Sequence, residues 1–68
     1  MKKLLKMIND TKVDMRVFSD ELGLIHVNFQ KNGLCLRRVF DPEVNFSSEI
    51  TMEDQIIFAL NDFLESLE

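Results

Sequence analysis

The first ten residues have the apolar spacing of a short amphipathic helix. At 100° per residue, apolar side chains gather on one arc and lysines lie opposite them. The apolar arc consists of Met1, Leu4, Leu5, Met7 and Ile8. Such a stripe packs on a protein core more often than on a membrane, and this segment is short for a membrane-surface helix. We therefore predict an N-terminal helix packed on the core.

Three segments of strand-like composition follow, namely Val13–Phe18, Leu24–Gln30 and Leu34–Phe40. Asn32-Gly33 separates the last two segments. This dipeptide is typical of a type I′ turn, because both central residues of that turn need a positive φ. The pattern therefore predicts an antiparallel meander that contains a two-residue hairpin.

The turns set the register of the predicted sheet. The two-residue turn gives the pairs Lys31–Leu34, Phe29–Leu36, Val27–Arg38 and Ile25–Phe40. A turn through residues 19–23 gives the pairs Phe18–Leu24, Val17–Ile25, Met15–Val27 and Val13–Phe29. Because side chains alternate between the faces of a strand, both hairpins place one apolar set on the same face. This set is Val13, Met15, Val17, Ile25, Val27, Phe29, Leu36 and Phe40.

Arg38 is the one charged side chain that the register places on this apolar face. A buried guanidinium without a partner is costly, so we expect Arg38 to reach solvent from an edge strand or to meet a carboxylate. Glu53 is the candidate partner because it lies within the apolar arc of the last helix.

The last segment has a clear helix start. Thr51 and Asp54 have the spacing of a capping box, and acidic residues in the first turn suit the helix dipole. The apolar arc is wide enough to cover a sheet and holds Met52, Ile56, Ile57, Ala59, Leu60, Phe63, Leu64 and Leu67. Before this helix, residues 41–43 form a turn, and Val44–Phe46 could add a short fourth strand at the sheet edge.

These elements define an α+β fold in the order α-β-β-β-(β)-α, with both helices on the apolar face of the meander. The 68 residues form a single small domain (1–68) of marginal stability. One cysteine excludes an internal disulfide and suits a reducing cytoplasm. Lys6, Asn9 and Asp10 interrupt the N-terminal apolar run too early for a signal peptide or a membrane span. We expect a cytoplasmic protein that does not associate with membranes.

Catalytic chemistry has few candidates in this sequence. His26 and Cys35 are the only pair that could combine a base with a thiol nucleophile. The register places them on one face but about 13 Å apart along the sheet, at ~3.3 Å per residue, and hydrogen-bond reach is ~3 Å. A zinc site fails for the same reason, and no phosphate-binding loop is present. We predict no enzyme, no metal site and no cofactor.

Charge divides the chain into two halves. Residues 1–38 carry all eight basic side chains and four acidic ones, whereas residues 39–68 carry eight acidic side chains and no Lys or Arg. The halves therefore have formal charges of +4 and −8, which sum to the net charge of −4. Such a division indicates either complementarity within the molecule or an acidic face for a basic partner.

The basic half raises the alternative of nucleic-acid binding. Arg16, Arg37 and Lys31 are candidates for phosphate contacts on the outer sheet face, where Phe18 is the only aromatic residue for stacking. A pI near 4.8 is opposite to the usual basic footprint and disfavours direct binding. A small dimeric nucleic-acid-binding protein is therefore our second hypothesis, and a structural oligomer subunit is the third.

The outer sheet face also carries apolar residues, namely Phe18, Leu24, Cys35 and Val39. In a domain of marginal stability, exposed apolar residues of this kind can mark a surface for self-association. We expect a homodimer formed through this face or through a strand edge.

The exposed arc of the last helix gives the preferred hypothesis. It holds Asp54, Phe58, Asn61, Asp62, Glu65 and Glu68. Glu65 and Glu68 stand at the negative end of the helix dipole, where acids are unfavourable, and we expect no Lys or Arg to relieve the arc. The alternative is that Glu65 and Glu68 belong to a frayed C-terminal tail that only increases solubility. We favour a non-enzymatic interaction module, a small acidic inhibitor of the phage, plasmid, immunity-protein or antitoxin kind, that covers a basic or nucleic-acid-binding surface of a partner.

Overall fold

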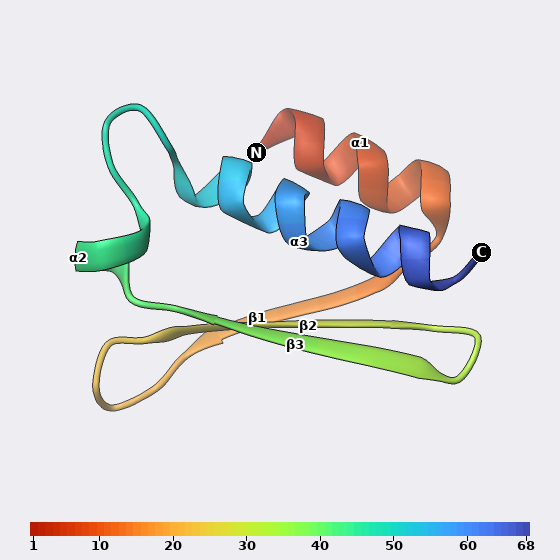
Figure 1. Ribbon diagram of the computed structural model, residues 1–68, viewed down its shortest axis with the longest axis horizontal. Coiled ribbons are helices and arrows are strands. Elements are labelled where there is room, and N and C mark those ends of the chain that lie inside the picture. Colours follow the sequence, from red (N-terminus) through yellow and green to blue (C-terminus); the bar gives the residue numbers. More distant parts are fainter.

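Six helices and strands follow one another along the chain. In the computed structural model, which describes residues 1–68, they are α1 (Lys2–Thr11), β1 (Asp14–Ser19), β2 (Ile25–Lys31), β3 (Leu34–Phe40), α2 (Pro42–Asn45) and α3 (Met52–Ser66). The strands form one antiparallel sheet in the order β1-β2-β3. Figure 1 shows α1 and α3 side by side on one face of this sheet, and no helix covers the other face. The predicted α+β fold is confirmed.

The hydrophobic core lies between the sheet and the two longer helices. Ten residues are buried, all of them apolar: Leu4, Val13, Val27, Phe29, Phe40, Ile56, Ile57, Ala59, Leu60 and Phe63. The rings of Phe29 and Phe63 stack with their centroids 5.8 Å apart and join β2 to α3. Half of the buried residues come from α3, so this helix contributes most to the core.

The hairpin of β2 and β3 has the predicted register. Phe29 lies opposite Leu36, and Val27 lies opposite Arg38. Asn32 and Gly33 have φ values of 54° and 81°, as a type I′ turn requires. The backbone conformation that this dipeptide favours is therefore sufficient to position the second hairpin.

The predicted register of β1 on β2 is wrong by two residues. Met15 lies opposite Phe29 and Val17 opposite Val27. The cause is the side chain of Asp20, which accepts hydrogen bonds from the backbone N–H groups of Leu22 and Leu24 and moves the turn toward Leu24. Because the shift is even, the side chains keep their predicted faces.

Gly23 completes the first turn. Its φ is 83°, and its N–H donates to the carbonyl of Asp20 at 3.0 Å, while the N–H of Asp20 donates to the carbonyl of Leu24 at 3.0 Å. This is the pattern of a G1 bulge, in which a left-handed glycine adds one residue to the strand. The turn between Asp20 and Leu24 therefore has three residues, 21–23, two fewer than the predicted turn of residues 19–23.

The predicted fourth strand at Val44–Phe46 is absent. Asp41 instead accepts a hydrogen bond from the N–H of Glu43 at 3.0 Å, and Pro42 occupies the first turn of the short helix α2. A side-chain cap followed by proline favours a helix start over a strand. The ring of Phe46 then packs near Phe40, with centroids 5.7 Å apart.

The apolar arc predicted for α1 is too wide. Only Leu4 is buried, Met7 and Ile8 are half-buried, and Met1 and Leu5 are 51% and 55% exposed. Leu5 lies about 100° around the helix from Leu4, so it falls at the margin of the packed face. None of the helices is long and apolar enough to cross a membrane.

Candidate interaction surfaces

The predicted partner-binding residues lie on α3 except Glu68, which follows the end of the helix, and most are exposed. We call Asp54, Phe58, Asn61, Asp62, Glu65 and Glu68 the acidic α3 surface. Phe58 is 58% exposed, and Asn61, Asp62, Glu65 and Glu68 are exposed as well, whereas Asp54 is half-buried. The helix thus presents an aromatic ring and several carboxylates to solvent on the side opposite its five buried residues.

Asp54 has a structural role at the start of α3. Its N–H donates to Thr51 Oγ1 at 3.2 Å, and its carboxylate accepts the N–H of Thr51 at 3.1 Å. This reciprocal pair is the predicted capping box, which is confirmed. Asp54 therefore stabilises the helix start, and its carboxylate is already partly occupied by the cap.

Asp62 lies on the flank of α3 that faces β3. Its Oδ2 is 3.7 Å from Nη2 of Arg38, and both side chains are largely exposed, at 66% and 43%. Arg38 reaches solvent and meets a carboxylate, as expected, but the carboxylate is not that of Glu53. The expectation that no arginine relieves the acidic arc is wrong for Asp62. An exposed pair of this length contributes at most about 1 kcal/mol.

Glu65 and Glu68 have no cationic partner. No Lys, Arg or N-terminal nitrogen lies within 4.0 Å of either carboxylate, and the last turn of α3 contains no basic residue. At the negative end of a helix dipole each acid is unfavourable by roughly 0.3–1 kcal/mol. These carboxylates therefore destabilise the isolated chain and receive no compensation inside it.

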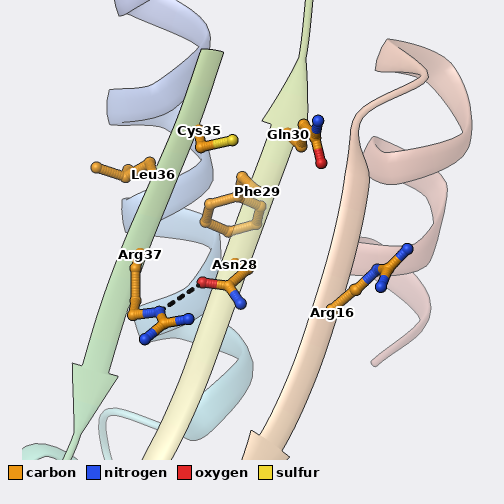
Figure 2. Close-up of a pocket in the computed structure, with 7 residues that line it drawn as sticks. All are labelled: Arg16, Asn28, Phe29, Gln30, Cys35, Leu36 and Arg37. Carbon is orange, nitrogen blue, oxygen red and sulfur yellow. Dashed lines mark hydrogen bonds between the residues drawn. The ribbon is translucent and has the colours of Figure 1, made fainter. Parts of the chain in front are cut away.

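The outer sheet face is the second exposed surface. Its side chains form three rows across the strands, which are Phe18–His26–Val39, Arg16–Asn28–Arg37 and Asp14–Gln30–Cys35. This face has a shallow hollow of about 480 Å³, lined by the middle row together with Phe29, Gln30, Cys35 and Leu36. Figure 2 shows these lining residues. The rows therefore place an apolar strip, a basic strip and a polar strip next to one another.

The two arginines of the middle row are oriented differently. Arg37 Nε donates to Asn28 Oδ1 at 2.9 Å, which holds the guanidinium over the sheet. Arg16 points away from Asn28 and Arg37 in Figure 2, and its Nε is 3.8 Å from Asp14 Oδ2. Lys31, the third predicted cation, is not on this face. It lies on the helix side and donates to the carbonyl of Thr11 at the end of α1.

The structure brings together only part of the predicted self-association set. Phe18 and Val39, 46% and 48% exposed, belong to one row with His26 between them. Cys35 is exposed but lies four residues further along β3, a separation of about 13 Å. Leu24 is half-buried beside the turn. Phe18 and Val39 are therefore the members that can act together.

Asp20 and His26 form a contact that the sequence pattern did not predict. The Nε2–H of His26 donates to Asp20 Oδ2 at 2.7 Å, and the His26 ring stacks on Phe18 with centroids 4.7 Å apart. This hydrogen bond holds the pKa of the Asp20 carboxyl below its ordinary value, with the two backbone donors adding to the effect. The sequence does contain a feature that could have indicated this turn, namely an aspartate at the start of a segment that ends in glycine. An aspartate side chain in a turn often accepts a hydrogen bond from the backbone N–H two residues later.

The remaining chemistry of the chain is sparse. His26 lies opposite Val39 and Cys35 opposite Gln30, so the two side chains are separated along the sheet as expected. No three His, Cys, Asp or Glu side chains lie close enough to hold a metal ion.

No family model matches the chain, and no similar curated protein or solved structure was found. Functional inference therefore depends on the two exposed surfaces.

Proposed function

We propose that this protein is a non-enzymatic interaction module that binds a basic surface of a partner protein through the acidic α3 surface. The observation that carries the proposal is Phe58, which is 58% exposed in the middle of α3 and lies among carboxylates. An aromatic ring on the solvent side of a helix does not contribute to the core, whereas a central interface aromatic can contribute ~2 kcal/mol or more to affinity.

The carboxylates around Phe58 supply the electrostatic part of the proposal. Glu65 and Glu68 are unpaired, and Asp62 has only a long, exposed contact with Arg38. A basic partner would convert these unfavourable positions into favourable ones, and it would speed association by attraction at long range. The acids thus disfavour the free chain slightly and favour a complex.

The partner class follows from the same surface. Exposed carboxylates beside a flat ring present negative charge and a stacking group, the two features by which a basic nucleic-acid-binding site recognises its ligand. The protein would therefore act as a small acidic inhibitor of the phage, plasmid, immunity-protein or antitoxin kind. It would occlude the basic site of its partner without changing it chemically.

The test is the affinity of substituted chains for a partner identified by affinity capture and mass spectrometry. Phe58→Ala should weaken binding by about 30-fold or more, which corresponds to ~2 kcal/mol. Leu22→Ala is the matched control, because Leu22 is 84% exposed in the first turn and lies outside α3. Its affinity should equal that of the wild type.

Charge reversal gives a second readout of the same surface. Asp62→Lys with Glu65→Lys should reduce mainly the association rate, and added salt should reduce the wild-type rate in the same way. The fold should stay intact, because both side chains are exposed. Wild-type affinity in both Phe58→Ala and the charge-reversed chain would exclude the acidic α3 surface as the binding site.

A second candidate function is direct binding of single-stranded nucleic acid by the outer sheet face. Arg16 and Arg37 lie in one row across the sheet, next to the stacked rings of Phe18 and His26. Cations beside an aromatic platform are the parts of a single-strand site. Fluorescence anisotropy with a labelled oligonucleotide distinguishes the candidates. This candidate requires binding that weakens steeply with salt and is lost in Arg16→Ala with Arg37→Ala.

A further inference from the structure

Strand β1 is an open edge of the sheet, because it pairs only with β2. Asp20 and Leu24 form a hydrogen-bonded pair, since the N–H of Asp20 donates to the carbonyl of Leu24 at 3.0 Å. Hydrogen-bonded pairs alternate along an antiparallel ladder, so Phe18, Arg16 and Asp14 also direct their backbone groups to β2. The backbone N–H and C=O groups of Met15, Val17 and Ser19 therefore point out of the sheet, where no strand receives them.

The side chains of β1 leave this edge accessible on its inward side, although Asp14 and Arg16 place charges on its outer face. None of its residues is buried, Val17 and Phe18 are 45% and 46% exposed, and the Arg16 side chain is 79% exposed. Proteins usually protect an edge with proline, a bulge or a charged residue that points inward. The register of β1 is continuous from Asp14 to Ser19, and its inward-facing positions are Met15 and Val17.

Strand β3, the other edge, carries the protection that β1 lacks. Arg38 occupies an inward-facing position opposite Val27, and its guanidinium reaches out to Asp62 of α3. A second chain added at this edge would have to accommodate an arginine beside the core. The two edges therefore differ, and β1 is the one that is open to another strand.

We propose that two copies of this chain pair through their β1 strands, antiparallel and with the two-fold axis at Val17, to form one continuous sheet with three strands from each copy. In this register Val17 exchanges both backbone hydrogen bonds with Val17 of the second copy. Met15 exchanges its hydrogen bonds with Ser19 of the second copy, and Ser19 with Met15. Every outward-pointing backbone group of the edge then has a partner.

The side chains agree with the same register. The exposed Val17 packs against its counterpart on the helix side, and Arg16 lies opposite Phe18 of the second copy on the outer sheet face. Arg16 already extends away from the middle of its own sheet (Figure 2), and a guanidinium over an aromatic ring is favourable. The unfavourable contact of this register is Asp14 opposite Asp20 of the second copy, at the two ends of the paired strands.

Neighbouring registers fit less well. An axis at Arg16 would set the two arginines directly opposite, which is destabilising. An axis at Phe18 would place Met15 opposite Glu21, which lies in the turn beyond the strand, and the outward groups of Met15 would stay unpaired. The surface is therefore self-complementary at Val17, which favours a second copy over an unrelated strand as its occupant. The dimer does not use α3 and does not depend on the proposed function.

The test uses proline at the edge, because the outward N–H of Val17 makes no bond within the chain. Val17→Pro removes that donor and leaves the pairing with β2 intact. Val39→Pro is the matched control, since β3 alternation also directs the Val39 N–H outward. Sedimentation equilibrium over a micromolar-to-millimolar series should give a dimer for the wild type and for Val39→Pro. Val17→Pro should raise the dissociation constant about tenfold or more.

Two further measurements keep the outcome decisive. Circular dichroism shows whether Val17→Pro is folded, and Val17→Lys, with a charge at the inward position, should give the same monomer if it is not. In a half-labelled wild-type sample, an intermolecular nuclear Overhauser effect between Val17 methyl groups fixes the register. A wild-type monomer at millimolar concentration overturns the proposal, even if the edge binds an added strand peptide. A dimer broken by Val39→Pro, or by neither proline, overturns it as well.

Discussion

Helices α1 and α3 lie side by side on the same face of the sheet, but they are stabilised in different ways. Helix α3 begins with a capping box from its own sequence and buries five residues. Helix α1 buries only Leu4, and no side chain of its own sequence caps its start. Residues far along the chain hold its two ends. The structure of α3 is therefore determined locally, whereas that of α1 depends on the rest of the fold.

The contacts at the ends of α1 show this dependence. At its start, Oε2 of Glu53 accepts the N–H of Leu4 at 3.2 Å and lies 2.9 Å from the Met1 amine. At its end, Lys31 donates to the carbonyl of Thr11, and Lys12 adopts a left-handed backbone with φ 60°. Helix ends leave backbone groups without partners, and here α3 and β2 supply them. The folding of α1 should therefore follow that of α3.

The largest expected effect comes from the core of α3. Phe63 is 2% exposed and stacks on Phe29, so Phe63→Ala should lower the free energy of unfolding by about 3–5 kcal/mol. For a small domain this is most of the stability. Urea denaturation followed by circular dichroism measures the change. Phe58→Ala, on the exposed side of the same helix, is the control and should stay within about 0.5 kcal/mol. Equal losses in both variants would place Phe58 in the core.

Truncation of the single buried residue in α1 should have a smaller effect. Leu4→Ala should lower the free energy of unfolding by about 2–3 kcal/mol, at the lower end for a buried leucine because a surface helix can settle into the space. Leu5→Ala, at a site that is 55% exposed, should change it little. Hydrogen exchange should show faster opening of α1 and unchanged protection of α3 in Leu4→Ala. Equal loss of protection in both helices would mean that they unfold as one unit.

The capping box gives the next smaller effect. Thr51→Ala should lower the free energy of unfolding by about 1 kcal/mol, because the N–H of Asp54 loses its acceptor. Thr51→Ser keeps a hydroxyl and should remain close to the wild type. Since Glu53 lies in the first turn of α3, the alanine variant should also speed hydrogen exchange at Leu4 of α1. Unchanged exchange at Leu4 would show that the hydrogen bond between the Leu4 N–H and Glu53 does not depend on the capping box.

The sequence determined those parts of the fold that depend on local patterns. Backbone preference at Asn32-Gly33 positioned the second hairpin, and the capping box with its apolar arc positioned α3. The first hairpin was shifted because the Asp20 side chain, and not backbone preference, selects the turn. The width of the α1 face and the partner of Arg38 depend on how distant elements approach one another, which periodicity does not encode.

Some features of the candidate sites could likewise be predicted from local sequence patterns, whereas others depend on how the strands pair. The exposure of Phe58 follows from its place on the helical arc, and the sequence was sufficient to predict it. The Asp20–His26 contact required the true register of the first hairpin, whereas the predicted order of the meander already made β1 an edge strand. In that register His26 stacks on Phe18, and Val17 becomes the centre of the edge.

The smallest effect, and the most direct test of how α1 depends on α3, concerns Glu53. Its hydrogen bond to the Met1 amine, followed by that from the Leu4 N–H, holds the pKa of its carboxyl below the ordinary value of 4.5. A carboxyl whose pKa is lowered in the folded state stabilises the fold above its unfolded pKa, and this contribution disappears as the pH falls through the lower folded pKa. Glu53→Gln should therefore be less stable than the wild type at neutral pH.

The pH dependence separates this charge effect from a loss of packing. The stability difference between wild type and Glu53→Gln should be constant between the unfolded pKa of Glu53 and neutral pH, and it should shrink as the solution is acidified below that pKa. Asp20 also has a lowered pKa, but it is present in both chains and cancels in the difference. Glu49→Gln, at an exposed site before α3, is the matched control and should show no such trend. If the stability difference stays the same at acidic pH, Glu53 stabilises α1 through the packing of its side chain and not through its charge.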